Sequence, residues 1–314
     1  MGSRVVVRAF ILLLIIGIGV SAETYIAKAD DGEVLPSYDI SWPQCPDNIP
    51  SGDFEFAVIG LNNGRPFTSN PCFMTQYEWA RNAEANPAVY INLDFPRQGR
   101  IEAANGPFGA CGEFEQWCRG YNWGYHLAED SVRQAQARGV RPSRYWLDVE
   151  MDNYWTNWTP FNAQVVRGVL DYFLEAHVPI GIYGTNYQWG LITGGVQAPE
   201  PLPLWVAGAT SGEMAAERCH QEKYAFAGGE TWMVQYPYNG YDGNVLCPLA
   251  RERQASSLIS PRGRSASANQ LSEANGAPLA RESPRLEGAA SGALVSALPL
   301  ELRTSQDWRD LLHR

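Results

Sequence analysis

The segment WLDVE, residues 146–150, places two carboxylates at the end of an apolar run. Asp148 and Glu150 are two positions apart, and alternate residues of a strand point to the same face, so their Cβ atoms would lie roughly 6–7 Å apart. Glycoside hydrolysis uses two carboxyl groups about 5–9.5 Å apart. One protonates the leaving oxygen, while the other stabilises the charge growing at the sugar carbon, attacks it or activates water. The alternative is the solvated polar end of a buried strand.

Other polar side chains stand where neighbouring apolar runs end. They are Asp39 after the first run, Asn92 and Asp94 after the third, Tyr183 after the fifth, Gln235 after the last, and Asp242 in the following loop YNGYDGN. Because the C-terminal ends of parallel strands meet at one face of a barrel, these side chains would gather around Asp148 and Glu150. Neighbouring acids push their pKa values apart, which suits an acid and a carboxylate partner. Each residue could instead be a polar strand end, and Asp242 could serve a glycine-rich turn.

Two tryptophans follow the acidic pair closely. Trp155 and Trp158 would lie on the loop at the same face, where an indole ring could stack on a sugar. The alternative for each is a place in the core, since aromatic rings commonly fill protein interiors. We therefore predict a substrate-binding set of Asp94, Asn92, Tyr183, Gln235, Trp155 and Trp158 around the catalytic candidates.

The elements that must position these residues alternate along the chain between residues 35 and 249. Strand-like runs cover 37–41, 54–61, 88–95, 144–150, 179–184, 202–208 and 231–237, and helix-like runs cover 76–86, 125–139 and 161–177. Continuous apolar strands are typical of a parallel sheet buried on both faces. The pattern predicts an α/β fold, an irregular (β/α) TIM-like barrel with parallel core strands. A doubly wound sheet is the alternative, although no glycine-rich phosphate loop follows the first strand.

The two ends of the chain have a different character. Arg4 and Arg8 precede an apolar stretch, residues 9–20, and small residues follow, which predicts a signal peptide over residues 1–29. An uncleaved anchor is the alternative, and after cleavage we expect no stable transmembrane segment. Residues 250–314 are of low complexity, and their first part is nearly free of aromatic residues, which predicts a mostly disordered tail.

Charge and cysteine content narrow the possible partners. The formal net charge is −10 and no basic stripe is present, which argues against nucleic acid. An even number of cysteines in an exported chain predicts disulfide-stapled loops. No Cys/His group has zinc-ligand spacing, so we expect no metal. Among the connectivities open to six cysteines, we favour nearest neighbours, namely Cys45–Cys72, Cys111–Cys118 and Cys219–Cys247.

The segments YDIS, FAVIGLNNG, YWLDVE, VPIGIYGT, PLWVAGA and MVQYPYNGYDGN, taken in order, resemble the lysozyme barrel of glycoside hydrolase family 25. The resemblance spans nearly all of residues 37–247. It is closest to an exported bacterial subgroup of glycoside hydrolase-like domains, through strings such as YDISWPQC and YNWGYHLAEDS. That family cleaves the β-1,4 bond between N-acetylmuramic acid and N-acetylglucosamine in peptidoglycan, on an irregular barrel with an acidic groove.

The resemblance implies a role for each of four acids. Glu150 matches the family's proton donor, and Asp148 matches the aspartate that assists the carbohydrate centre. Asp39 matches the first-strand aspartate that positions substrate and tunes the acid, and Asp242 matches the late aspartate beyond the last parallel strand.

Two features depart from the family's pattern. Its third strand usually carries a Tyr-His pair, whereas this chain has Asn92 and Asp94 there, and its own Tyr-His pair, residues 125–126, falls in a predicted helix. Residues 97–120 form an extra loop that contains Cys111 and Cys118 and could narrow or close the groove.

These observations predict an exported, monomeric glycoside hydrolase that acts on cell-wall glycan by muramidase-type hydrolysis of peptidoglycan. It would be secreted or associated with the cell wall and would use no cofactor. One alternative is a catalytically silent barrel that binds cell-wall glycan. Another is a hydrolase of a different polysaccharide, for which the missing Tyr-His pair is the relevant departure.

Overall fold

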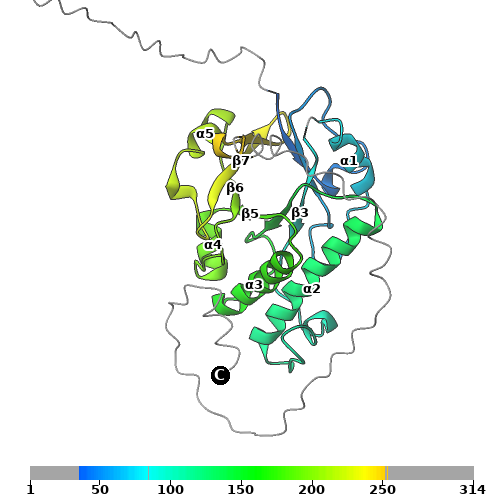
Figure 1. Ribbon diagram of the computed structural model, residues 1–314, viewed down its shortest axis with the longest axis vertical. Coiled ribbons are helices and arrows are strands. Elements are labelled where there is room, and N and C mark those ends of the chain that lie inside the picture. Colours follow the sequence, from blue (N-terminus) through cyan, green and yellow to red (C-terminus); the bar gives the residue numbers. More distant parts are fainter. Residues whose placement is uncertain (1–34, 84, 252, 254–314) are drawn as a thin grey trace, which may run out of the picture. The chain divides into compact units, whose positions relative to one another are not determined.

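The computed structural model describes residues 35–83, 85–251 and 253, which fold around a closed barrel of eight strands (Figure 1). The strands are β1 (Tyr38–Ile40), β2 (Ala57–Gly60), β3 (Ala88–Asn92), β4 (Tyr145–Asp148), β5 (Ile180–Gly184), β6 (Pro203–Val206), β7 (Glu230–Tyr238) and β8 (Tyr241–Leu246). Neighbours from β1 to β7 pair in parallel. The prediction of an irregular α/β barrel with parallel core strands is confirmed.

The strand β8 differs from the prediction, which placed its residues in a loop. It runs antiparallel to both β7 and β1 and closes the barrel between them. The turn that leads into it is Asn239-Gly240, whose φ angles of 50° and 82° are both positive. Such a two-residue turn matches the right-handed twist of a tight hairpin. Asp242 therefore belongs to a strand of the barrel wall.

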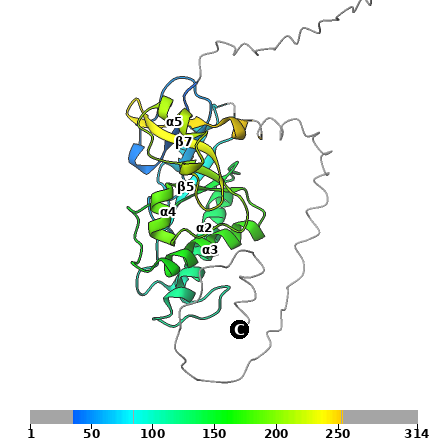
Figure 2. The ribbon, with the colours of Figure 1, turned by 90° about the vertical axis from the view of Figure 1, so that its left-hand side faces the viewer.

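Among the residues that the structure describes, five helices and three short 3-10 turns connect the strands. The helices are α1 (Phe73–Ala80), α2 (Gln116–Ala137), α3 (Thr159–Glu175), α4 (Asn186–Thr193) and α5 (Gly212–Arg218), and the turns are η1 (Trp42–Gln44), η2 (Ile101–Ala103) and η3 (Glu222–Tyr224). Figures 1 and 2 show α4 next to α3, in agreement with their contacts. The helix α2 begins at Gln116, earlier than the predicted start at residue 125. The Tyr-His pair at 125–126 consequently lies inside α2.

Glycines explain why the sequence signal for the first turns of α2 is weak, and they also explain the close contact between α2 and α3. A Cβ on Gly124 would overlap the Val165 carbonyl, and a Cβ on Gly168 would overlap the Tyr121 carbonyl. The two helix backbones therefore approach more closely than larger residues would allow. Because glycine disfavours helix in isolation, this stretch carries a weak helical signal in the sequence and forms a helix through tertiary packing.

The interior of the barrel is filled by large side chains. Trp146 and Trp205 meet edge to face with ring centroids 5.8 Å apart, and Met233 is buried in the same cluster. Gly181 leaves the space that the Trp146 indole occupies. A buried indole removes about 200 Å² from water, which stabilises the fold by roughly 5 kcal/mol. This packed layer supports the polar residues at the strand ends above it.

The three predicted disulfides are all present, as Cys45–Cys72, Cys111–Cys118 and Cys219–Cys247. The first ties the segment after β1 to the start of α1. The second closes a small ring at the start of α2, and the third joins the end of α5 to the residue after β8. The three disulfides thus fix segments that connect the strands of the barrel.

The predicted signal peptide and most of the predicted tail lie outside the described residues. The barrel extends slightly beyond the expected end at residue 249, because Ala250 is fully buried against the interior cluster and Arg251 donates to Glu55. Within the part of the chain that the structure describes, no helix combines the length and the hydropathy needed to cross a bilayer.

Candidate active site

The C-terminal ends of β1 to β7 open on one face of the barrel, which we call the mouth. Register places Asn92, Asp148 and Tyr183 side by side across β3, β4 and β5. On the opposite wall, Asp39 faces Asp242 and Gln235 faces Asn244. The strand ladder continues past β4, where the Val149 N–H donates to the Tyr183 carbonyl at 3.1 Å, and Glu150 follows. The four predicted acids therefore come together at the mouth.

Asp39 is held by a network of amide donors. Gln235 Nε2 donates to both carboxylate oxygens at 3.1 and 3.2 Å, and Asn244 Nδ2 donates to Oδ2 at 2.7 Å. These amides are themselves oriented, since Trp205 Nε1 donates to Asn244 Oδ1 and the Tyr183 hydroxyl donates to Gln235 Oε1. Desolvation and the nearby Asp242 raise the pKa of Asp39 well above its ordinary value, while the amide donors lower it. Asp39 is therefore fixed in one orientation.

Asp148 has a poorer set of partners. Its side chain is buried, and Asn92 Nδ2 donates to Oδ2, while Oδ1 has no hydrogen-bond partner among the described residues. Burial first, and then the charges of Glu150 and Asp39, raise the pKa of Asp148 well above its ordinary value. An ionised Asp148 is thus costly in the free protein, and a positive charge developing beside it would relieve that cost.

Glu150 is partly exposed and faces the mouth beside Asp148. Removal from water raises its pKa, the Tyr183 hydroxyl, whose single proton is shared between Glu150 and Gln235 Oε1, lowers it, and the charge of Asp152 raises it. Its backbone carbonyl accepts a hydrogen bond from Trp155 Nε1 at 2.8 Å, which fixes the loop that carries it. A carboxyl group that is both accessible and inclined to keep its proton is suited to general acid catalysis.

Asp242 is the most exposed of the four acids, and partial desolvation raises its pKa from the ordinary value. Its position opposite Asp39 puts two carboxyl groups on the same side of one strand pair. All four acids thus have raised pKa values in a site with little competing positive charge. The arrangement can hold a proton on one carboxyl and a negative charge on another, as acid-catalysed cleavage of a glycosidic bond requires.

Two residues that sequence reasoning missed belong to the same site. Tyr90 lies near Asp148 and Asp39, interacts with Ser41, and has its pKa raised by burial. Gly60 makes room for the Tyr90 ring, which a Cβ there would crowd. The other missed residue is Asn244, which positions Asp39. Each stands two residues from a predicted site residue, so strand alternation was the signal that could have found them.

Asp94 lies in a different environment from the acid cluster. Trp123 Nε1 donates to its backbone oxygen at 2.9 Å and to Oδ1 at 3.2 Å. Desolvation raises the pKa of Asp94 to about 6, and the Trp123 hydrogen bond and nearby arginines act in the opposite direction. The hydrogen-bond partner of Asp94 is thus Trp123, whereas the predicted neighbours Asn92 and Gln235 donate to Asp148 and Asp39, and Tyr183 interacts with Glu150.

The two tryptophans of the β4–α3 loop have different surroundings. Trp155 is partly buried against the core, and its ring nitrogen is bound to the Glu150 carbonyl, so it positions the loop. Trp158 leaves 60% of its surface exposed and could contact a ligand. Of this pair, Trp158 exposes the larger part of its ring.

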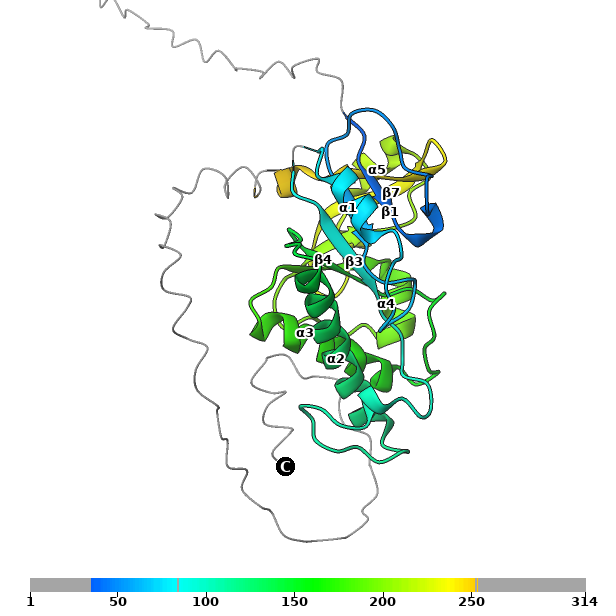
Figure 3. The same ribbon diagram turned by 90° about the vertical axis from the view of Figure 1, so that its right-hand side faces the viewer.

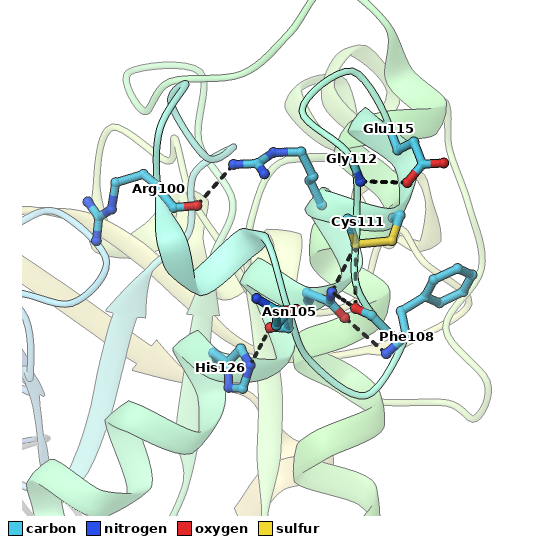
Figure 4. Close-up of a disulfide and its surroundings, with 11 residues drawn as sticks. Arg100, Asn105, Phe108, Cys111, Gly112, Glu115 and His126 are labelled. Carbon is cyan, nitrogen blue, oxygen red and sulfur yellow. Dashed lines mark hydrogen bonds between the residues drawn. A yellow bond between two sulfur atoms is a disulfide. The ribbon is translucent and has the colours of Figure 1, made fainter. Parts of the chain in front are cut away.

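The extra loop between β3 and α2 folds back on the start of α2 (Figure 4). Asn122 accepts from the Phe108 N–H and donates to the Gly109 carbonyl, each at 2.9 Å, and His126 contacts the Asn105 carbonyl at 3.0 Å. Figures 1 and 3 both place this loop at the end of α2, remote from β1 and β7. The predicted loop, residues 97–120, is partly helical, because α2 starts at Gln116. Its remaining part is a wall beside α2, away from the Asp39–Asp242 side of the mouth.

The family model described as Lysozyme-like protein 1 matches residues 116–234, from the start of α2 into β7. No curated protein matches the chain. The resemblance to a lysozyme-like chain, inferred from the sequence, is confirmed over the matched residues.

Several solved structures are similar to the chain at low identity. A family GH25 lysozyme from Aspergillus fumigatus is 18% identical with a TM-score of 0.45, over 70% of this chain and 97% of that one. The catalytic domain of endolysin ply40 from bacteriophage P40 of Listeria monocytogenes is 14% identical with a TM-score of 0.42, over 71% and 97%. The Cpl-1 endolysin, in complex with a peptidoglycan analogue, is 16% identical with a TM-score of 0.39, over 67% and 53%.

Proposed function

We propose that this lysozyme-like chain is an exported glycoside hydrolase that cleaves cell-wall glycan, with peptidoglycan as its substrate and a β-1,4 muramidase-type reaction. The observation that carries the proposal is the meeting of four carboxyl groups at the mouth, with Asp148 at the end of β4 and Glu150 two residues later. The family match over residues 116–234 supports it, because this stretch includes the Asp148–Glu150 pair.

In the proposed reaction Glu150 is the general acid. Its raised pKa keeps a proton available, and its exposure lets the carboxyl reach a glycosidic oxygen. Transfer of that proton neutralises the departing alkoxide while the bond to the sugar carbon breaks. Positive charge grows at the sugar carbon as this bond breaks. Water then adds to that carbon, and the proton that the water loses passes to a carboxylate of the site, which completes the hydrolysis.

Asp148 stabilises the charged sugar centre or orients an assisting group on the sugar. Its unpartnered oxygen Oδ1 and its single amide donor leave it able to interact with a ligand. The gain in attraction as the sugar becomes positive lowers the barrier, because that attraction is weaker in the ground state. Asp39 and Asp242 maintain the negative field around the site, and Asp39 is held for that role by Gln235 and Asn244.

Export is proposed on two grounds. The three disulfides are bonds that persist in oxidising compartments outside the cytosol. The sequence also has the charged and apolar pattern of a signal peptide at residues 1–29. The protein would act as a secreted or wall-associated monomer, and the proposed reaction uses only side chains and water.

One observation favours a second candidate, a barrel that binds cell-wall glycan without cleaving it. Asp39 and Asp148 are only 7% and 3% exposed, and both accept hydrogen bonds from the protein's own amides. A ligand would meet Glu150 and Asp242 first. Binding without close approach to Asp148 would leave the charged transition state unsupported.

The test separates the two candidates. The exported chain, recovered with its disulfides intact, is incubated with purified peptidoglycan, and new reducing ends are identified by mass spectrometry. Glu150→Gln is the test variant, and Glu217→Gln on the exposed side of α5 is the matched control. Release by the wild type and the control, with a loss of at least about 100-fold in Glu150→Gln, supports the hydrolase. Pull-down by peptidoglycan without release from any protein would favour the binding barrel.

A further inference from the structure

A pocket lies beside the mouth, between the segments that follow β3 and β4. Its volume is about 500 Å³. One wall is the segment from Phe95 to Gln98, and the other runs from Tyr154 to Trp158. The two walls are joined where the Phe95 N–H donates to the Tyr154 carbonyl at 2.7 Å. The disulfide loop drawn in Figure 4 supports the third side, next to the first turn of α2.

The lining of this pocket carries positive charge in an acidic protein. Arg97 and Arg119 line it, against one carboxylate, Glu113, which accepts a hydrogen bond from Gln98. Arg119 is only 6% exposed, and its Nη2 donates to the Arg100 carbonyl at 2.9 Å, so its guanidinium is fixed in place. A guanidinium held in this way presents N–H donors in a planar fork that matches a carboxylate.

Aromatic side chains surround these two arginines. Trp158 and Phe114 line the pocket and are 60% and 87% exposed. Tyr154, also on the lining, has the Arg97 guanidinium 4.3 Å above its ring centroid. Exposed rings next to fixed donors are suited to a ligand with a flat apolar face and an attached anion.

The pocket is connected to the mouth through one short loop. This loop begins at Glu150 and reaches the pocket at Tyr154. Trp155 holds the loop in place, because its Nε1 donates a hydrogen bond to the Glu150 carbonyl. The acids at the mouth repel a carboxylate, whereas the arginines attract it. An anionic saccharide would therefore be oriented, with its charged substituent toward the arginines and an adjoining ring toward Glu150.

We infer that this pocket is an accessory binding site for a carboxylate-bearing sugar ring of the glycan, with the ring against Trp158 and the carboxylate on Arg97 and Arg119. The identity of the polymer rests on the proposed function, but binding at this site does not require turnover. The site makes the protein prefer acidic glycans over neutral ones of the same backbone.

The test measures equilibrium binding by calorimetry on the full chain carrying Glu150→Gln, so that no ligand is consumed. The probes are the disaccharide of N-acetylglucosamine and N-acetylmuramic acid, the neutral disaccharide N,N′-diacetylchitobiose (below, chitobiose), and a disaccharide that carries glucuronic acid. Arg97→Gln and Trp158→Ala are the site variants, chosen because both side chains are exposed. Arg141→Gln, an exposed arginine between α2 and β4, is the matched control.

The expected result is that both acidic disaccharides bind about tenfold more tightly than chitobiose, and that Arg97→Gln removes this difference while Arg141→Gln keeps it. Trp158→Ala should weaken all three probes. Preference for the muramic acid probe alone, still dependent on Arg97, would identify the lactyl carboxylate as the recognised group. Equal affinities in Arg97→Gln and Arg141→Gln would overturn the inference.

The outcomes also separate this inference from the proposed function. Arg97-dependent binding together with absence of hydrolysis would keep the accessory site and reject the hydrolase. Hydrolysis by the wild type without Arg97-dependent binding would keep the hydrolase and reject the accessory site.

Discussion

Asp39 on β1 and Asp242 on β8 are directly opposite each other in the antiparallel pair that closes the barrel. Directly paired residues of two strands point to the same face, so the two carboxyl groups share the mouth. The charge of Asp242 contributes to the raised pKa of Asp39. The reversal of a single strand therefore adds a fourth acid to the site, and it also brings Asn244 to Asp39.

Tyr183→Phe should move the alkaline limb of the activity profile to higher pH. The hydrogen bond from Tyr183 lowers the pKa of Glu150, and its loss leaves the effect of burial less opposed. Activity requires the protonated acid and falls as pH rises through that pKa, so the fall should occur later in the variant. The measurement is kcat/KM against pH. Tyr187→Phe, an exposed tyrosine on α4, should reproduce the wild-type profile, and an unmoved limb in Tyr183→Phe would contradict the prediction.

Asp148→Asn should abolish most of the activity and yet stabilise the fold at neutral pH. Because burial raises the pKa of Asp148, the folded protein binds its proton more tightly than the unfolded chain. Stability is therefore lost as pH rises above about 3.9, the pKa of this aspartate in the unfolded chain. The asparagine side chain of the variant does not titrate, so the variant does not lose this stability. Urea unfolding should show a gain of about 1–3 kcal/mol at pH 7.5 and a smaller gain at pH 4. A gain that shrinks with rising pH would be the wrong sign.

Asn122→Ala should loosen the loop beside the accessory pocket. Asn122 is fully buried and satisfies both the Phe108 N–H and the Gly109 carbonyl. Leaving these groups without partners should cost about 2–3 kcal/mol and speed hydrogen exchange at the Phe108 amide. The exposed Asn82→Ala change should have no effect on that amide. Unchanged protection in Asn122→Ala would show that the disulfide alone holds the loop.

Gly124→Ala and Gly190→Ala should change the free energy of unfolding in opposite directions. The added Cβ of the first would overlap the Val165 carbonyl, and separating α2 from α3 should cost about 1–3 kcal/mol. The second glycine is in α4, where nothing lies within 4 Å of the added atom, so alanine should stabilise by about 0.5–1 kcal/mol through helix propensity. Paired thermal melts of the two variants measure the difference, and equal midpoints would contradict the packing argument.

The residues that could be predicted from the sequence were those whose local pattern agrees with the fold. Continuous apolar runs with polar ends located the seven parallel strands, and strand alternation placed Asp148 and Glu150 on one side. The pattern failed for β8, where the glycine, the acid and the asparagine of YDGN resemble a turn. The Asn239-Gly240 pair just before it was nevertheless a hairpin signal.

Other features depend on contacts between distant residues and were not visible locally. The first turns of α2 contain glycines that weaken the helical pattern. The reason for a glycine such as Gly124 is the close packing of α2 against α3, which the local sequence does not show. Likewise, the hydrogen bonds that Asp94 accepts come from Trp123, more than twenty residues away, and the local pattern around Asp94 does not indicate this partner.

The antiparallel strand also decides where the polypeptide enters and leaves the barrel. Pro36 precedes β1 and accepts from the Glu55 N–H, while Arg251 follows β8 and donates to the Glu55 side chain, so entry and exit are neighbours. Both are on the side opposite the mouth, because β8 runs back from it. A fluorescent tag, a tether or a second domain joined at either point would leave the acids facing outward. The same proximity makes the barrel suited to circular permutation, with a short linker across the Glu55 side and a new opening in an exposed loop.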